Sequence, residues 1–218
     1  MAGNLIVLVH GLSGSAASHF GSLQERLSDD QDDFSSYKIR CFEYPSTKTS
    51  IFPWSEDDVN LDNTSSSLAS FLDLHADGAD NIILIGYSTG GILLRMALLR
   101  ATAYVVGRVS KIIYIATPFK GSDLGNASRW LNLGSTLAQE LRVGSPILDK
   151  LEVDWRSSEV CNIIEYYLWG TRDNVARVDP SIPDHKCFFS SHNHSTIRIF
   201  NKGDDHYKKL RDWILGKR

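Results

Sequence analysis

Short apolar runs alternate with longer amphipathic segments along the chain. Runs such as Leu5–Val9 are apolar at every position, which is typical of strands buried on both faces of a parallel sheet. The predicted strands are Leu5–Val9, Tyr37–Tyr44, Ile82–Ile85, Val109–Ile115, Ile163–Trp169 and Cys187–Phe189. The predicted helices are Ser18–Leu27, Ser65–His75, Gly90–Arg100 and Asp204–Leu215. This alternation predicts the α/β fold class, with helices on both faces of the sheet and right-handed crossovers.

The segment between the fourth and fifth predicted strands, Phe119–Val160, departs from this simple alternation. Its Trp130, Leu133, Leu137 and Leu141 recur at helical spacing, which predicts an amphipathic helix. We interpret residues 119–160 as a helical cap or an elaborated crossover. The alternative is a slightly long helical connection that packs into the core.

Composition and charge narrow the class of protein. With 218 residues, 42% of them hydrophobic and 22% charged, the chain suits one globular domain over residues 1–218. The balance of 23 basic and 26 acidic residues gives a net charge of only −3, so nothing favours nucleic acid as a partner. The opening apolar run is too short to span a bilayer and lacks a basic leader, so we expect no transmembrane segment and no signal peptide. Three cysteines are too few for a disulfide framework, which favours a cytoplasmic location.

A G-x-S-x-G motif joins the third predicted strand to the helix after it, with Ser88 at its centre. A serine on a sharp strand-to-helix turn needs unusual backbone angles, and the flanking Gly86 and Gly90 relieve the crowding there. The helix N-terminus offers free amide hydrogens and a positive dipole end, which suit a developing oxyanion. We predict Ser88 as a nucleophile, the alternative being an ordinary glycine-rich turn.

A second loop, His10-Gly11-Leu12, leaves the first strand at its carboxyl end, which is the edge of a parallel sheet where ligands bind. The backbone amide of Leu12, joined by that of Thr89, would make an oxyanion hole of the kind that lowers acyl-transfer barriers. His10 is interpreted as a structural residue that holds the loop, with a role as the catalytic base as the alternative.

These motifs, with the A-T-P-F-K-G-S stretch over residues 116–122, resemble those of a small lipase or esterase of the α/β-hydrolase superfamily. The resemblance covers nearly the whole chain. Because the chain begins at what would be the family's third strand, the resemblance implies a minimal hydrolase fold of about six mostly parallel strands. It also implies a Ser-His-Asp triad in the chain order Ser, Asp, His, with no metal and no organic cofactor.

The acid of the triad should follow the strand after the insertion. Residues 169–175 read W-G-T-R-D-N-V, which matches the family's G-x-x-D-x-V pattern and makes Asp173 the preferred acid. Asp179 is a nearby substitute. For either residue, the alternative role is a turn carboxylate that caps backbone amides.

The base should come last in the chain. The histidines that compete for this role are His185, His192, His194 and His206. We prefer His194, because His194-Ser195-Thr196-Ile197 resembles the family's H-S-x-I segment. His192 is the next candidate, and His206 is assigned to one face of the terminal helix.

Other classes of protein fit the sequence less well. A zinc site would have to use His185, Cys187, His192 and His194, whose spacing matches no structural zinc pattern. A nucleotide-binding domain would need a G-x-G-x-x-G turn or a P-loop, and the sequence has neither. A non-catalytic binding module on a hydrolase scaffold would usually have lost its nucleophile or its base.

The predicted function is therefore that of a serine hydrolase that cleaves carboxylic esters through an acyl-enzyme. Phe52 and Trp54 follow the second strand at the carboxyl edge, and Phe119 and Trp130 belong to the insertion that leaves the same edge. We expect these aromatic side chains to bind a lipid-like or medium-chain acyl ester. The same triad would also serve a thioesterase, an amidase or an acyltransferase.

Overall fold

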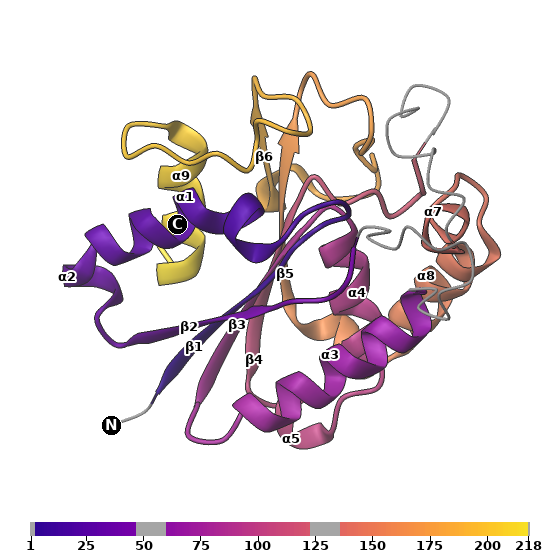
Figure 1. Ribbon diagram of the computed structural model, residues 1–218, viewed down its shortest axis with the longest axis horizontal. Coiled ribbons are helices and arrows are strands. Elements are labelled where there is room, and N and C mark those ends of the chain that lie inside the picture. The colour runs from indigo at the N-terminus through magenta and orange to yellow at the C-terminus, as the bar shows by residue number, and fades with distance from the viewer. Residues whose placement is uncertain (1–2, 47–59, 123–135, 218) are drawn as a thin grey trace.

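Six parallel strands form one sheet in the computed structural model, which describes residues 3–46, 60–122 and 136–217 (Figure 1). In the order β2-β1-β3-β4-β5-β6, each strand pairs in parallel with its neighbour. The strands are β1 (Asn4–Val9), β2 (Tyr37–Phe42), β3 (Asn81–Tyr87), β4 (Val109–Ile115), β5 (Ile164–Gly170) and β6 (Cys187–Ser190). The predicted fold class, a mostly parallel sheet flanked by helices, is confirmed.

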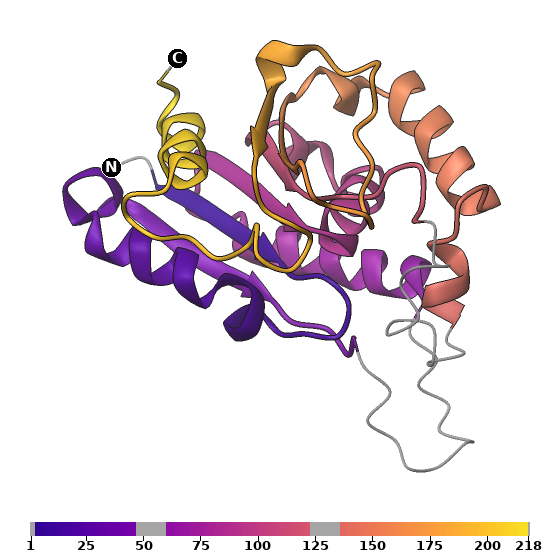
Figure 2. The same cartoon turned by 90° about the horizontal axis from the view of Figure 1, so that it is seen from above.

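Helices cover both faces of this sheet (Figures 1 and 2). The α-helices are α1 (Ala16–Asp29), α2 (Gln31–Phe34), α3 (Leu61–His75), α4 (Thr89–Leu98), α5 (Ala103–Val106), α7 (Thr136–Glu140), α8 (Pro146–Ser157) and α9 (Asp205–Leu215). The described ranges also contain the 3-10 helices η1 (Glu159–Asn162) and η2 (Asp184–Lys186). Helices α1 and α9 lie on one face, whereas α3, α4 and α8 lie on the other. None of the helices in the described ranges is both long and apolar enough to cross a bilayer.

The spacing of apolar residues explains which surface each element buries. Residues Ile82–Ile85 of β3 have no exposed surface, as expected for a central strand with helices on both sides. The edge strand β2 instead alternates between exposed and more buried positions. In α1, Phe20, Leu23 and Leu27 recur at helical spacing and are all buried.

Helix α8 was not predicted, although its pattern is present in the sequence. Pro146 occupies its first turn, where a proline costs no hydrogen bond, and Leu148, Leu151 and Trp155 form its buried face. The helix predicted for this insertion lies earlier in the chain, between Trp130 and Leu141. Of its four marker residues, Leu137 belongs to α7 and Leu141 directly follows it, and both are buried, whereas Trp130 and Leu133 lie outside the described residues.

The order of the strands fixes where a ligand would bind. The chain runs outward from β1 to β2 and then crosses back to β3 on the other side of β1. Strands β1 and β3 are neighbours whose connections run in opposite directions, so the loops at their carboxyl ends diverge. Such a switch point forms a crevice at the edge of the sheet. The loop after β1 and the turn at Ser88 after β3 both leave this edge. The sheet therefore brings together the two segments in which the sequence predicts catalytic groups, the loop that begins at His10 and the turn at Ser88.

Candidate active site

Ser88 occupies the sharp turn between β3 and α4 in a strained conformation. Its φ of 52° and ψ of −124° belong to a region of backbone space that residues with a side chain seldom adopt. Its amide donates to the carbonyl of Ile115 at 2.9 Å, which ties the turn to the end of β4. Backbone strain of this kind costs on the order of 1–3 kcal/mol and occurs at sites whose surroundings enforce it.

Beyond this turn, α4 begins in direct contact with the end of β1. A Cβ atom on Gly90 would lie 2.0 Å from the carbonyl oxygen of Val9 and 2.8 Å from that of His10. Only glycine allows this approach, because the atoms in the way belong to the backbone and cannot rotate aside.

We therefore expect Gly90→Ala to lower the free energy of unfolding by about 2 kcal/mol or more. Gly21→Ala is the matched control, because Gly21 lies within α1 and a Cβ there would have no atom within 4 Å. That substitution should raise the free energy of unfolding by about 0.5–1 kcal/mol. Urea unfolding of both variants measures the difference. Equal effects of the two changes would show that the contact with β1 is not tight.

A chain of hydrogen bonds links Ser88 to two more distant residues. Ser88 Oγ lies 2.9 Å from His194 Nε2, and His194 Nδ1 lies 2.8 Å from Asp173 Oδ2. An ionised carboxylate only accepts, so the Nδ1 hydrogen of His194 is donated to Asp173. The other ring nitrogen is then free to accept the hydroxyl hydrogen of Ser88. This arrangement can remove a proton from the serine as its oxygen attacks.

Asp173 is held by the turn that follows β5. Its Oδ1 accepts hydrogen bonds from the amides of Val175 at 2.8 Å and Ala176 at 3.0 Å. The other carboxylate oxygen faces His194, and the side chain of Asp173 has no exposed surface. Asp173 therefore caps backbone amides and orients the histidine at the same time.

The residues weighed as substitutes for Asp173 and His194 have other partners. Asp179 accepts from the amide and the hydroxyl of Ser181, at 2.9 and 2.7 Å. His192 Nδ1 lies 2.5 Å from Ser190 Oγ. His206 Nε2 lies 3.0 Å from the carbonyl oxygen of Ile199. None of these contacts involves Ser88.

The side chains considered as zinc ligands likewise lie in different local environments. His185 belongs to η2 and is exposed, whereas Cys187 begins β6. Burial raises the pKa of the Cys187 thiol, which disfavours the thiolate that binds metals. In the ranges that the structure describes, no three His, Cys, Asp or Glu side chains are grouped to hold a metal ion.

The loop after β1 leaves the amide of Leu12 between two anchored neighbours. The Gly11 amide donates to His19 Nδ1 at 3.2 Å, and the Ser13 amide donates to the carbonyl of Ser46 at 3.1 Å. Thr89 is the first residue of α4, so its amide has no partner within the helix. No hydrogen bond from the amide of Leu12 or Thr89 to another described residue is found. Within the described part of the chain, both amides thus lack an acceptor, and their role as oxyanion donors stays a prediction.

His10 is a buried structural residue of this loop. Its ring stacks on Tyr44 at 4.3 Å, and Nε2 accepts from the Tyr44 amide at 3.3 Å. The remaining ring nitrogen, Nδ1, donates to the carbonyl of Gly11 at 2.9 Å. Burial lowers the pKa of His10, although the nearby Gly11 carbonyl and Glu43 oppose this shift. Both nitrogens are therefore used to hold the backbone.

Two residues that support the site were not predicted from the sequence. Tyr87 donates its hydroxyl hydrogen to the backbone carbonyl of His194 at 2.9 Å, which holds the loop that carries the histidine. His19 lies on the buried face of α1 and contacts the loop after β1. A lone histidine among the apolar positions of α1 is the signal that was available in the sequence.

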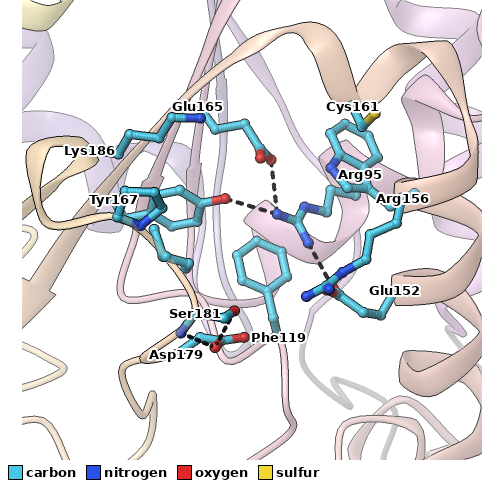
Figure 3. Close-up of a pocket in the computed structure, with 13 residues that line it drawn as sticks. Arg95, Phe119, Glu152, Arg156, Cys161, Glu165, Tyr167, Asp179, Ser181 and Lys186 are labelled. Atoms are coloured by element: carbon cyan, nitrogen blue, oxygen red, sulfur yellow. Dashed lines mark hydrogen bonds and ion pairs between the residues drawn. The ribbon is translucent and has the colours of Figure 1, made fainter.

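A cavity of about 190 Å³ lies beside the sheet on the side of α8 (Figure 3). Arg95 of α4 bridges Glu165 at 2.9 Å and Glu152 at 3.2 Å across one wall, and it also donates to the hydroxyl of Tyr167 at 3.0 Å. The guanidinium carbon of Arg95 lies 3.8 Å from the ring centroid of Phe119. The lining includes none of the three residues of the hydrogen-bond chain.

The aromatic residues expected to bind substrate are placed only in part. Phe119 is buried, lines this cavity and packs against Arg95, so its contact with a substrate stays a prediction. Phe52, Trp54 and Trp130 lie outside the described residues.

Comparisons with known proteins identify the same fold. The mature lipase BlEst2 from Bacillus licheniformis superposes with a TM-score of 0.68 and 17% identity over 96% of this chain and 92% of that one. Methylesterase MES16 from Arabidopsis gives a TM-score of 0.56 and 17% identity over 97% of both chains. Phospholipase PlaB from Legionella pneumophila gives 0.60 and 20% identity over 78% of this chain, which spans only 38% of that protein. At such identities, the likeness shows the fold alone.

The sequence itself matches a family model. No curated protein sequence matches the chain significantly. A model of the alpha/beta hydrolase family, however, matches residues 6–197, which include the loop after β1, Ser88, Asp173 and His194. The resemblance drawn from the motifs is thereby confirmed. The chain belongs to the alpha/beta hydrolase family.

Proposed function

We propose that this hydrolase cleaves carboxylic esters through a triad of Ser88, His194 and Asp173. The observation that carries the proposal is the continuous hydrogen-bond chain from Ser88 Oγ through both nitrogens of His194 to Asp173, with distances of 2.9 and 2.8 Å. Such a chain activates a serine hydroxyl that is otherwise a weak nucleophile.

In the first half of the reaction, His194 Nε2 takes the hydroxyl proton as Ser88 Oγ attacks the acyl carbon. The carbonyl oxygen becomes an oxyanion, which accepts hydrogen bonds from the amides of Leu12 and Thr89. Asp173 stabilises the imidazolium through its hydrogen bond to Nδ1. The ester bond then breaks, and His194 donates its proton to the leaving alcohol, which produces an acyl-enzyme.

In the second half, water replaces the alcohol. His194 removes a proton from the water molecule as it attacks the acyl carbon, and the same two amides bind the second oxyanion. The bond to Ser88 Oγ breaks, Oγ regains its proton from His194, and the carboxylic acid leaves. Every proton that His194 accepts is returned within one half-reaction, so the cycle needs no cofactor.

We further propose that the acyl group is lipid-like or of medium length and that residues 1–218 act as one catalytic domain of a cytoplasmic enzyme. Support for the substrate comes from the aromatic residues predicted to line the site and from similar folds described as a lipase and a phospholipase. Support for the location comes from Cys41, Cys161 and Cys187, which are all unpaired.

A panel of 4-nitrophenyl esters from acetate to octanoate tests this proposal. Each methylene buried in an apolar channel contributes about 0.8 kcal/mol, so kcat/KM should rise roughly fourfold per methylene until the channel is filled. Substrates are kept below their micellar concentration. A flat or falling profile would contradict the lipid-like acyl group. Failure of the folded protein to hydrolyse any of these esters would contradict ester hydrolysis itself.

The matched butyryl thioester and butyryl 4-nitroanilide separate the alternatives that use the same triad. The proposal expects the ester to have the highest kcat/KM of the three. A kcat/KM that is higher for the thioester than for the ester identifies a thioesterase. A kcat/KM that is higher for the anilide than for the ester identifies an amidase. Product analysis in the presence of an added alcohol detects an acyltransferase.

A further inference from the structure

The imidazole of His19 fills the inside of the loop that follows β1. His19 belongs to the first turn of α1, and only 6% of the residue is exposed. Its Nδ1 accepts a hydrogen bond from the Gly11 amide at 3.2 Å. At the far side of the loop, a Cβ atom on Gly14 would lie 2.3 Å from Cε1 and Nε2 of the same ring. The loop Gly11–Gly14 is therefore shaped around this imidazole.

The same ring is in contact with the segment that carries the nucleophile. The ring of Tyr87, the residue before Ser88, lies edge-on to the ring of His19 with centroids 4.9 Å apart. A Cβ atom on Gly11 would lie 2.9 Å from the Cβ of Ser88, so the loop rests directly against the serine. The residue whose amide His19 accepts is therefore also the residue that packs against Ser88.

His19 can accept this hydrogen bond only as a neutral ring. An amide N–H only donates, so Nδ1 carries no hydrogen and the single ring hydrogen is on Nε2. Burial, together with the neighbouring Arg198, His10 and His194, lowers the pKa of His19 to about 4. At neutral pH, the imidazole is therefore unprotonated at Nδ1 and remains an acceptor.

The two ends of the loop are held by different residues. Ser46 holds the far end, because its hydroxyl donates to the carbonyl of Gly14 at 2.7 Å and its carbonyl accepts from the Ser13 amide at 3.1 Å. His19 holds the Gly11 amide at the end next to Ser88. Loss of the Nδ1 acceptor thus leaves the Gly11 amide without its partner, and His10 Nδ1, 2.9 Å from the Gly11 carbonyl, remains the only side-chain hydrogen-bond partner of that residue found among the described residues.

We propose that His19 is a positioning residue that, by accepting from the Gly11 amide, fixes the Leu12 amide where it stabilises the oxyanion. The proposal rests on the proposed function, in which Leu12 supplies one of the two oxyanion donors. His19 acts through the loop and touches neither the substrate nor the reacting atoms. Its loss should therefore weaken binding of the transition state more than binding of the substrate.

The variants His19→Asn and His19→Leu form a matched pair. Their side chains have the same branched shape, but only the asparagine Oδ1 can take the place of Nδ1 as an acceptor. We expect His19→Leu to lower kcat for a 4-nitrophenyl ester by about tenfold to a hundredfold with KM changed less than about twofold. We expect His19→Asn to keep kcat within about threefold of the wild type.

A trifluoromethyl ketone supplies a readout that a merely structural role would not move, because it adds to the serine and places an oxyanion in the same site. Its inhibition constant should rise in His19→Leu by the factor by which kcat/KM falls. Unchanged kcat in His19→Leu, or an equal loss in both variants, would overturn the role of His19. A wild-type protein without ester hydrolysis would instead contradict the proposed function, and the positioning role of His19 with it.

Nitrogen-15 NMR of the wild-type histidines tests the hydrogen bond from the Gly11 amide to His19 Nδ1 without any substitution. It therefore tests the proposal even if His19→Leu fails to fold. At pH 7, His19 should be neutral, with its hydrogen on Nε2 and an unprotonated Nδ1. A hydrogen on Nδ1, or a protonated ring at pH 6, would contradict the contact with Gly11 on which the proposal depends.

Discussion

Ser88→Ala should lower kcat for 4-nitrophenyl esters by at least about 10⁴-fold while leaving the protein folded. The reason is that Ser88 Oγ is the atom that forms the acyl-enzyme, and alanine offers no substitute nucleophile. Stability should change little, because alanine lacks only the hydroxyl group and its backbone strain at this turn is the same as that of serine. Steady-state kinetics and urea unfolding measure the two effects.

Ser190→Ala is the matched control for this change. Ser190 is also buried and also contacts a histidine, with its Oγ 2.5 Å from His192 Nδ1. It lies at the end of β6, not on a strand-to-helix turn, and it does not contact the proposed triad. Its loss should change kcat less than about threefold. If Ser190→Ala were the variant without activity, the nucleophile would have been assigned to the wrong serine–histidine pair.

Asp173→Asn should lower kcat by about 10⁴-fold. The amides of Val175 and Ala176 donate to Oδ1, and only an oxygen can accept there. The asparagine must therefore turn its NH₂ group toward His194. A donor at this position forces the ring hydrogen onto Nε2, and Nε2 can then no longer accept the proton of Ser88.

Asp179→Asn tests whether the segment after β5 contributes one carboxylate to catalysis or two. Asp179 accepts from Ser181 and lies 3.7 Å from the ammonium group of Lys120, whereas the carboxylate that contacts His194 is that of Asp173. Its conversion should change kcat less than about threefold. Comparable losses in Asp173→Asn and Asp179→Asn would indicate that the two carboxylates act together.

Much of the fold could be predicted because the central strands are apolar at nearly every position. The predicted ends of all six strands fall within two residues of those in the structure. Helix α8 was missed because its buried Leu148, Leu151 and Trp155 are interspersed with charged residues such as Lys150 and Glu152. Its clearest sequence signal is Pro146 at the start, which apolar spacing alone does not reveal.

The residues of the candidate site were predictable to the extent that each follows directly from a strand. Ser88 comes immediately after β3, and Asp173 lies three residues beyond β5, so the sheet brings both to one edge. The contacts of His19 with Gly11 and of Tyr87 with His194 were not predictable. They depend on how α1 and the final loop pack against the turn, which no local pattern in the sequence encodes.

Covalent labelling with a fluorophosphonate, followed by peptide mass spectrometry, tests the central claim most directly. The reagent reacts with a serine only where a base activates the hydroxyl and an oxyanion site receives the phosphoryl oxygen. The account predicts one adduct per chain, located on Ser88, absent from Ser88→Ala and retained in Ser190→Ala. An adduct on another serine, undiminished labelling of Ser88→Ala, or ester hydrolysis by a wild-type protein that the reagent neither labels nor inhibits would contradict it.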